Sequence, residues 1–315
     1  STMTEQLKLK LNDSKATRWG ALVIVAFTMM AAYYVNDVVA PLKTMLETDL
    51  AWSSTDFGFF TGGYSFLNVF FLMLIWGGLI LDRFGIRFTG KLATILMVGG
   101  TALEYYAMTG LAGADATLFG INEIFGYKTG VFVAFAGYSI FGVGAEVAGI
   151  TVSKIIAKWF KGKELATAMG VQVALARIGS QAGYAVAIPL ARAFGISTPV
   201  LLGLVLLLGG MIAFFIFAVM DKKLDKQMEA AAIAAGTEDE EEKFSFKDVK
   251  NILVNPGFWL IALLCVLFYS CVFPFQKFAS ELMIIKYGIN ENVAGTFAGL
   301  PALGALILTP VFGGF

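Results

Sequence analysis

Long apolar stretches alternate with short charged or glycine-containing breaks along the whole chain. Each stretch is close to the roughly 20 residues that a helix needs to cross about 30 Å of hydrocarbon. We expect helices, because an open sheet edge would leave backbone groups without hydrogen bonds in lipid. The pattern therefore predicts an all-α integral membrane protein. The eight expected spans are 19–42, 57–81, 88–111, 130–157, 164–190, 198–220, 256–279 and 293–315.

A polar segment interrupts this pattern after the sixth span. It contains Lys222, Lys223, Lys226 and the acidic run Glu238 to Glu242, a composition that buries too little apolar area to fold alone. We give it no binding role. The expected parts are a polar N-terminal tail (1–18), an N-terminal six-helix bundle (19–220), a cytoplasmic linker (221–254) and the start of a C-terminal bundle (255–315).

A weak internal repeat supports this division. A shift of 236 positions, which is 269 minus 33, superimposes the start of the second bundle on the first. On this register the sequence ends after the first two helices of the C-terminal bundle, so we expect a truncated chain that lacks four further spans. The matched pairs are Tyr33 with Tyr269, Gly63 with Gly299, Gly77 with Gly313 and Gly78 with Gly314.

The distribution of charge predicts the orientation. Cations cluster in alternate loops, which the positive-inside rule places in the cytoplasm together with the N-terminus. The intervening loops, with Glu47, Asp49, Asp56, Asp115 and Glu123, are expected outside. The cations are Lys8, Lys10, Lys15 and Arg18 before the first span, Arg83, Arg87 and Lys91 after the second, and Lys158, Lys161 and Lys163 after the fourth.

Composition excludes several classes of function. Hydrophobic residues make up 58% and charged residues 15% of the chain, against about 45–50% and about 25% in soluble domains. The 23 basic and 23 acidic residues balance, so nucleic acid has no electrostatic attraction for the chain. Cys265 and Cys271 lie in an apolar run and indicate neither a disulfide nor a metal site. With no nucleophile and base pair and no phosphate-binding loop, we expect no enzyme and no cofactor or metal.

The loop after the second span carries a specific motif. Residues 78–87 read GLILDRFGIR, which resembles the loop signature of the major facilitator superfamily: a glycine, then Asp-Arg, then a glycine and a basic residue. Ile86 and Gly90 depart from the usual pattern, whereas Asp82, Arg83, Gly85 and Arg87 fit it. Gly85 can adopt the positive φ of a turn. The resemblance implies that these four residues act in a conformational switch.

Within that superfamily the chain is most similar to the branch that contains the animal lysosomal dipeptide transporters. The superfamily implies a fold of twelve helices in two bundles, which works by alternating access. The branch implies short peptides as substrate, moved as a uniport. The matching segments are 84–87 (FGIR), 159–165 (WFKGKEL), 176–180 (ARIGS), 248–250 (DVK) and 272–275 (VFPF).

Polar residues inside spans are costly and form stripes at helical spacing. One stripe on the fourth span includes Ser139, Glu146 and Ser153, and one on the fifth includes Arg177, Gln181 and Tyr184. Each position could serve bundle packing, but aromatic and amide groups also suit a peptide backbone. The further candidates for substrate binding are Tyr33, beside Asp37, on the first span, Tyr64 and Asn68 on the second, and Tyr269, near Gln276, on the seventh.

Glu146 and Arg177 are the strongest pair. The mean of 146 and 177 is 161.5, so both are equally far from the Lys161-Gly162 turn of a helical hairpin. At about 1.5 Å per residue they lie roughly 20 Å from its cytoplasmic end, near the membrane midplane where such transporters bind substrate. We expect a clamp in which Glu146 binds the ammonium group and Arg177 the carboxylate of a zwitterion. The alternative is a structural ion pair between them.

Three functions fit these patterns. The first is a monomeric uniporter of short peptides or similar zwitterions in the lipid bilayer. The second is a proton-coupled exporter or organic-anion carrier, which would use Asp37, Glu104 or Glu146 because the chain has no histidine. The third is a non-transporting membrane sensor. The N-terminal tail has no acidic dileucine-type signal, and the outside loops have no Asn-x-Ser/Thr acceptor, which favours a bacterial cytoplasmic (inner) membrane, with the lysosomal membrane as the alternative.

Overall fold

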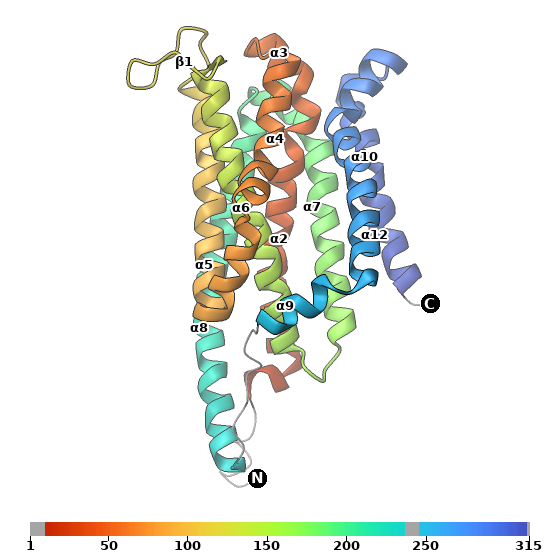
Figure 1. Ribbon diagram of the computed structural model, residues 1–315. Coiled ribbons are helices and arrows are strands. Elements are labelled where there is room, and N and C mark those ends of the chain that lie inside the picture. The colour runs from red at the N-terminus through yellow and green to blue at the C-terminus, as the bar shows by residue number, and fades with distance from the viewer. Residues whose placement is uncertain (1–9, 237–245, 314–315) are drawn as a thin grey trace.

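The computed structural model describes residues 10–236 and 246–313, and long helices standing side by side dominate it (Figure 1). Two short strands form a small antiparallel hairpin at one end. The elements are η1 Leu11–Asp13, α2 Lys15–Val38, η2 Ala40–Leu42, α3 Lys43–Asp49, α4 Ser54–Phe70, α5 Met73–Thr109, β1 Glu123–Ile124, β2 Tyr127–Lys128, α6 Thr129–Trp159, α7 Leu165–Phe194, α8 Thr198–Ala235, α9 Phe246–Leu253, α10 Pro256–Tyr287, α11 Glu291–Ala298 and α12 Leu300–Gly313.

Local sequence sets several helix ends. Ser53 accepts a hydrogen bond from the backbone N–H of Asp56 at 3.1 Å, and the Asp56 carboxylate accepts one from the Ser53 N–H at 2.9 Å. This capping box starts α4. Asn255 caps α10 in front of Pro256, and Gly288 ends the same helix in the left-handed conformation. The chain therefore marks its own helix boundaries at these points.

The number of helices able to cross a membrane differs from the eight expected spans. Among the described residues, five helical stretches are long and apolar enough, and α4 and α5, bent by 58° relative to each other, together form a sixth, broken one. The expected second and third spans both fall within this bent pair. Helix α7 has 30 residues but does not reach the same hydropathy, because it carries the polar stripe around Arg177.

Two breaks shape the α4–α5 region. The first is at Leu72, whose φ of 53° separates the two helices inside the expected second span. No sequence signal announced this break. The second is at Gly85, where φ is 81° and ψ is 176° inside α5. The positive φ expected at Gly85 from the motif is therefore confirmed.

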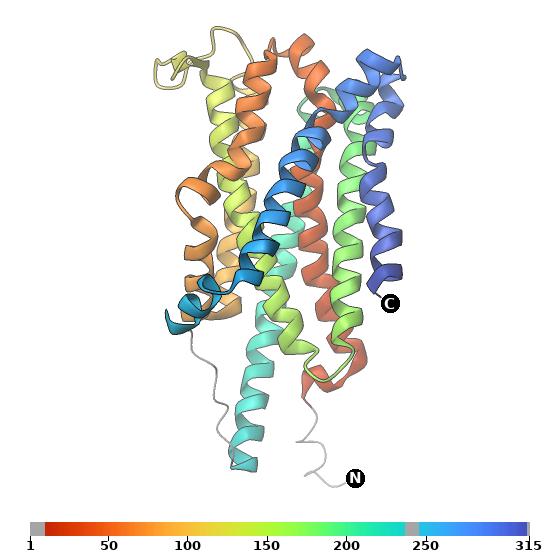
Figure 2. The same cartoon turned by 45° about the vertical axis from the view of Figure 1, so that its right-hand side comes forward.

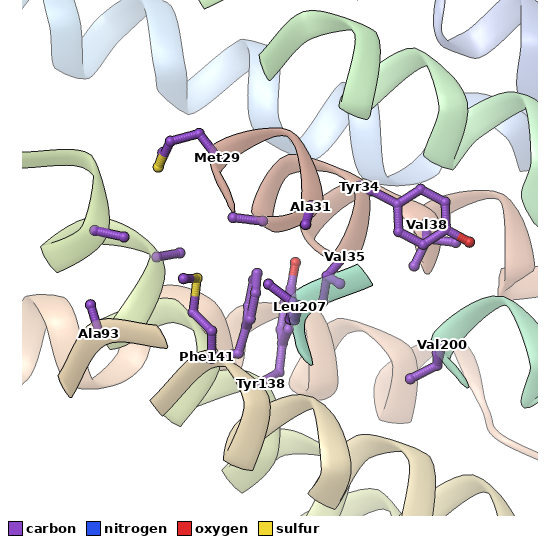
Figure 3. Close-up of a cluster of buried hydrophobic side chains, with 14 of the residues drawn as sticks. Met29, Ala31, Tyr34, Val35, Val38, Ala93, Tyr138, Phe141, Val200 and Leu207 are labelled. Carbon is purple, nitrogen blue, oxygen red and sulfur yellow. The ribbon is translucent and has the colours of Figure 1, made fainter. Parts of the chain in front are cut away.

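Glycines and aromatic residues build the core of the first six long helices. A Cβ on Gly100 of α5 would lie 2.4 Å from the carbonyl oxygen of Gly137 on α6, so only glycine allows this approach. Tyr138 and Phe141 of α6 pack against Val35 of α2 in the buried cluster shown in Figure 3. Close packing of this kind positions the polar residues that lie on neighbouring faces.

The segment expected to be a linker over 221–254 is helical over much of its described length. Helix α8 continues to Ala235, and residues 246–253 form helix α9. Asp221 and Leu224 are fully buried. The Asp221 carboxylate accepts hydrogen bonds from residues of α5 and α6, and these bonds hold this turn of α8 against the bundle. Asp221 therefore has a structural role, which the composition of the segment did not indicate. The run Glu238 to Glu242 lies outside the described residues.

The last helices stand beside α7 and α2 in Figures 1 and 2. Helix α10 packs on η2 and α3, whereas α11 and α12 pack on α7. The bundle thus has two distinguishable ends: one carries α3 and the β hairpin, and the other carries α9 and the motif loop around Asp82. We refer to them as the α3 end and the α9 end.

Candidate functional site at the centre of the bundle

Glu146 and Tyr64 meet between α4 and α6. The Tyr64 hydroxyl donates a hydrogen bond to Glu146 Oε1 at 2.7 Å. Helix α6 runs from 129 to 159, so its midpoint is residue 144 and Glu146 lies two positions from it. Two residues predicted from separate stripes are therefore in direct contact, about halfway along the helix.

Arg177 lies on α7 beside Tyr33 of α2. Its guanidinium carbon is 5.8 Å from the centre of the Tyr33 ring, a cation–π arrangement. In the described part of the chain Arg177 forms no ion pair within 4.0 Å, and Glu146 is not its partner. The structural ion pair considered as the alternative is thus not formed here. The charges of both residues nevertheless act on the Tyr33 hydroxyl, which places Tyr33 near both.

The remaining predicted binding residues fall in two places. Tyr269 of α10 lies near Tyr33 and stacks on Phe273 with ring centroids 4.9 Å apart. Asn68 donates to the Tyr64 carbonyl oxygen at 3.2 Å. Gln181 instead lies against Gly299 at the contact with α12, since a Cβ there would be 2.4 Å from its Oε1. The structure groups Tyr33, Tyr64, Asn68 and Tyr269 with the charged pair and turns Gln181 toward α12.

Two amide oxygens in this region are buried without a hydrogen-bond partner among the described residues. They are Oδ1 of Asn68 and Oε1 of Gln181. A buried acceptor without a partner is unfavourable, and a bound molecule with N–H groups would satisfy it. Of the two, Oδ1 of Asn68 lies beside Tyr64 in the candidate site and is therefore suited to receive a hydrogen bond from a peptide backbone. No group of three or more His, Cys, Asp or Glu side chains in the described segments could hold a metal ion.

Lys277 of α10 is a functional candidate that sequence reasoning missed. Its ammonium group donates to the Asn36 carbonyl oxygen at 2.6 Å and to the Tyr138 hydroxyl at 2.9 Å. It also interacts electrostatically with Asp37, whose carboxylate accepts a hydrogen bond from Ser180. A charged residue inside an apolar span is itself a signal. Lys277 escaped notice because the span was expected to end two residues later, where lysines commonly reach the interface.

Glu104 lies within the electrostatic reach of the same lysine, Lys277. Glu104 is fully buried in α5, and neither carboxylate oxygen has a hydrogen-bond partner within the described residues. The charge of Lys277 acts on it. The centre of the bundle thus holds three carboxylates, Asp37, Glu104 and Glu146, and two cations, Arg177 and Lys277, of which Lys277 comes from α10.

The motif residues lie at the α9 end, apart from this centre. Asp82 pairs with Lys154 at 3.2 Å, with both side chains about half exposed. Arg87 donates to Asp221 at 2.8 Å and also pairs with Asp225. Lys158 and Trp159 of α6 donate to the same Asp221 at 2.9 Å. Arg83 lies over Phe84.

These hydrogen bonds and ion pairs connect α5, α6 and α8 at the α9 end, close to Gly85 in the sequence. Sequence reasoning identified Arg87 but not Asp221, its buried partner, because 221 was expected to begin a solvated linker. The motif loop is thus anchored to a helix that lies far from it in the sequence.

A bundle of long apolar helices around a charged and aromatic centre defines a multi-pass membrane protein of the solute-carrier class. The sequence model of the Major Facilitator Superfamily matches residues 22–315, so the chain belongs to the Major Facilitator Superfamily. The predicted family and all-α membrane fold are confirmed by this match. The family consists of transporters rather than enzymes.

Curated relatives refine the comparison. The chain is 27% identical over 312 residues to the lysosomal dipeptide transporter MFSD1 of Homo sapiens, covering 95% of this chain and 61% of that protein. It is 26% identical over 306 residues to MFSD1 of Pongo abelii, covering 93% and 59%. The Gallus gallus protein of the same name is 32% identical over 190 residues, covering 56% and 41%. The chain spans about 60% of the length of the first two relatives.

Proposed function

We propose that this protein transports short peptides or similar zwitterions across a membrane by alternating access, as a monomeric uniporter. The observation that carries the proposal is the placement of Glu146 and Arg177. They bear opposite charges on α6 and α7, make no ion pair with each other in the described segments, and share Tyr33 as a neighbour. Two opposite charges held apart can bind the two ends of a zwitterion.

The dimensions suit a dipeptide. Two residues of extended chain span at most about 7 Å, and the long side chains of Glu146 and Arg177 can extend toward the two ends of such a molecule. The ammonium group would bind Glu146, whose orientation is set by the Tyr64 hydroxyl. The carboxylate would bind the planar fork of Arg177. The unpartnered oxygen of Asn68 could accept from the peptide N–H.

Contacts at the α3 end support a carrier closed on that side. Lys43 is buried and donates to Glu281 of α10 at 2.5 Å and to Glu47 of α3 at 2.7 Å. Arg192, near the end of α7, pairs with Glu291 at the start of α11. These ion pairs join the first six long helices to α10 and α11. Alternating access then requires that they separate when the α3 end opens.

The relatives support the substrate class. Their name describes a lysosomal dipeptide transporter, and we carry the peptide substrate over to this chain as part of the proposal. The lysosomal membrane of those relatives is the compartment that we gave as the alternative. We propose an orientation with the α9 end in the cytoplasm, because the loop cations gather there.

A thermal-shift panel on the full-length protein tests the proposal. Dipeptides, single amino acids, sugars and organic anions are added in turn, since a ligand at 100 times its dissociation constant stabilises by about 2.7 kcal/mol. We expect dipeptides to raise Tm and sugars to leave it unchanged. Stabilisation by organic anions alone would reject the peptide assignment.

A proton-coupled exporter is the second candidate, and Glu104 is the observation that favours it. Its buried carboxylate lacks hydrogen-bond partners in the described residues, as expected of a group that exchanges a proton. Dipeptide uptake into proteoliposomes that acidifies or alkalinises the lumen would identify coupling. A uniporter moves the same peptide with no change in lumenal pH.

A further inference from the structure

The connection between α5 and α6 folds into two successive tight turns with the same unusual sequence. Leu118 pairs with Ile121 around Phe119-Gly120, and Ile124 pairs with Tyr127 around Phe125-Gly126. In each turn both central residues have positive φ, 52° and 78° in the first and 51° and 81° in the second. Two-residue turns with this geometry are type I′.

Phenylalanine is a poor choice for such a position. The first central residue of a type I′ turn is usually Asn, Asp or Gly, because a Cβ is crowded in the left-handed conformation. Here the sequence places Phe there twice. A strained residue that persists points to a requirement outside the turn itself.

Exposure indicates what that requirement is. Phe119 is 96% exposed and Phe125 is 87% exposed, and Ile121 between them is 50% exposed. In both Figure 1 and Figure 2 the hairpin projects sideways from the ends of α5 and α6, away from α10 and α12. The turns thus hold aromatic side chains outside the perimeter of the bundle.

The hairpin lies at the level of lipid headgroups. Helix α6 has 31 residues and is roughly 46 Å long at about 1.5 Å per residue, which matches a bilayer of about 40–45 Å with its headgroups. Lys154 and Lys158 mark the α9 side of the membrane. The other end of α6, at Thr129, directly follows the hairpin and therefore lies near the opposite headgroups.

We propose that Phe119 and Phe125 insert into the headgroup region of the leaflet at the α3 end, so that the hairpin anchors α5 and α6 to the lipid surface. Tyr106, near the end of α5 that leads into this connection, is also exposed. Residues 110–128 carry two carboxylates, Asp115 and Glu123, against the single ammonium of Lys128. Zwitterionic lipid is therefore the fitting partner, and anionic lipid is not required.

Site-directed fluorescence quenching tests this in the full-length protein. Cys265 and Cys271 are replaced, and Phe119→Cys or Phe125→Cys carries a nitrobenzoxadiazole label in phosphatidylcholine proteoliposomes. Asp115→Cys, exposed in the same connection, is the control. We expect headgroup-level spin-labelled lipid to quench the two Phe positions at least twofold more strongly than Asp115, and aqueous iodide to show the reverse order. Equal quenching by iodide at all three positions, or shielding from both quenchers, overturns the proposal.

A second variant separates lipid contact from turn stability. Phe119→Asn with Phe125→Asn places the preferred residue in both turns. We expect Tm to stay equal or rise in a lipid-free amphipathic polymer and to fall, relative to the wild type, in phosphatidylcholine nanodiscs. A Tm that changes in the same direction and by the same amount in both media contradicts lipid anchoring.

Discussion

The ammonium group of Lys277 lies 2.9 Å from the Tyr138 hydroxyl and 2.6 Å from the Asn36 carbonyl oxygen. This contact inserts a charge from α10 between α2 and α6, beside Asp37 and Glu104. A partly buried cation within an apolar span is stabilised when nearby carboxylates compensate its charge. Helix α10 and the first six long helices are therefore coupled through charge at the centre of the bundle as well as through the ion pairs at the α3 end.

Replacing Lys277 should reveal this coupling. Lys277→Met leaves Asp37 and Glu104 without their shared cation, so we expect a loss of about 3 kcal/mol in the free energy of unfolding. Lys286→Met, an exposed lysine on the same helix, should cost less than about 0.5 kcal/mol. Denaturation of both variants in the same lipid measures the difference. Equal losses of unfolding free energy in the two variants would show that Lys277 does not compensate the charges of Asp37 and Glu104.

The buried ion pairs of Lys43 with Glu47 and Glu281 at the α3 end should contribute to stability in a non-additive way. Lys43→Met removes the partner of both Glu47 and Glu281, so we expect about 2–3 kcal/mol of destabilisation. Combining it with Glu281→Gln should cost less than the sum of the single changes, because a stranded carboxylate is removed at the same time. Strictly additive losses in this double-mutant cycle would exclude the interaction.

Asp82 should affect the access switch and leave substrate recognition unchanged. It lies at the α9 end, and its pair with Lys154 is half exposed, so Asp82→Asn should change stability by less than about 1 kcal/mol. We expect slower peptide transport with nearly unchanged equilibrium binding, compared with Asp115→Asn as a control. A tenfold loss of affinity at normal turnover would assign Asp82 to the binding site instead.

Cysteine labelling tests the orientation. Ser14 before α2 and Ser53 before α4 are both exposed and lie at opposite ends of the bundle. In a background without Cys265 and Cys271, an impermeant maleimide added to intact cells should label Ser53→Cys and spare Ser14→Cys. Labelling of Ser14→Cys alone would show that the protein has the opposite orientation.

Several features of the fold and site followed from sequence because they depend on local chemistry. The positive φ of Gly85 follows from the motif, and the polar stripes on the second and fourth spans included Tyr64 and Glu146, which the structure brings into contact. The roles of these residues in binding stay predictions. The break at Leu72, the burial of Asp221 and the position of Lys277 were not foreseen. Each depends on contacts between residues more than 60 positions apart or on packing that local pattern does not encode.

The most direct test of the proposed function compares free and blocked dipeptides on the full-length protein. A C-terminal amide removes the charge that Arg177 would bind, and an N-acetyl group removes the one that Glu146 would bind. We predict that free dipeptides raise Tm and that both blocked forms bind at least tenfold more weakly, which is a loss of about 1.4 kcal/mol in binding free energy. We also predict that Arg177→Lys retains the fold but loses most of the discrimination against the amidated dipeptide. If amidated and acetylated dipeptides stabilise the wild type as well as free ones do, the zwitterion clamp is wrong.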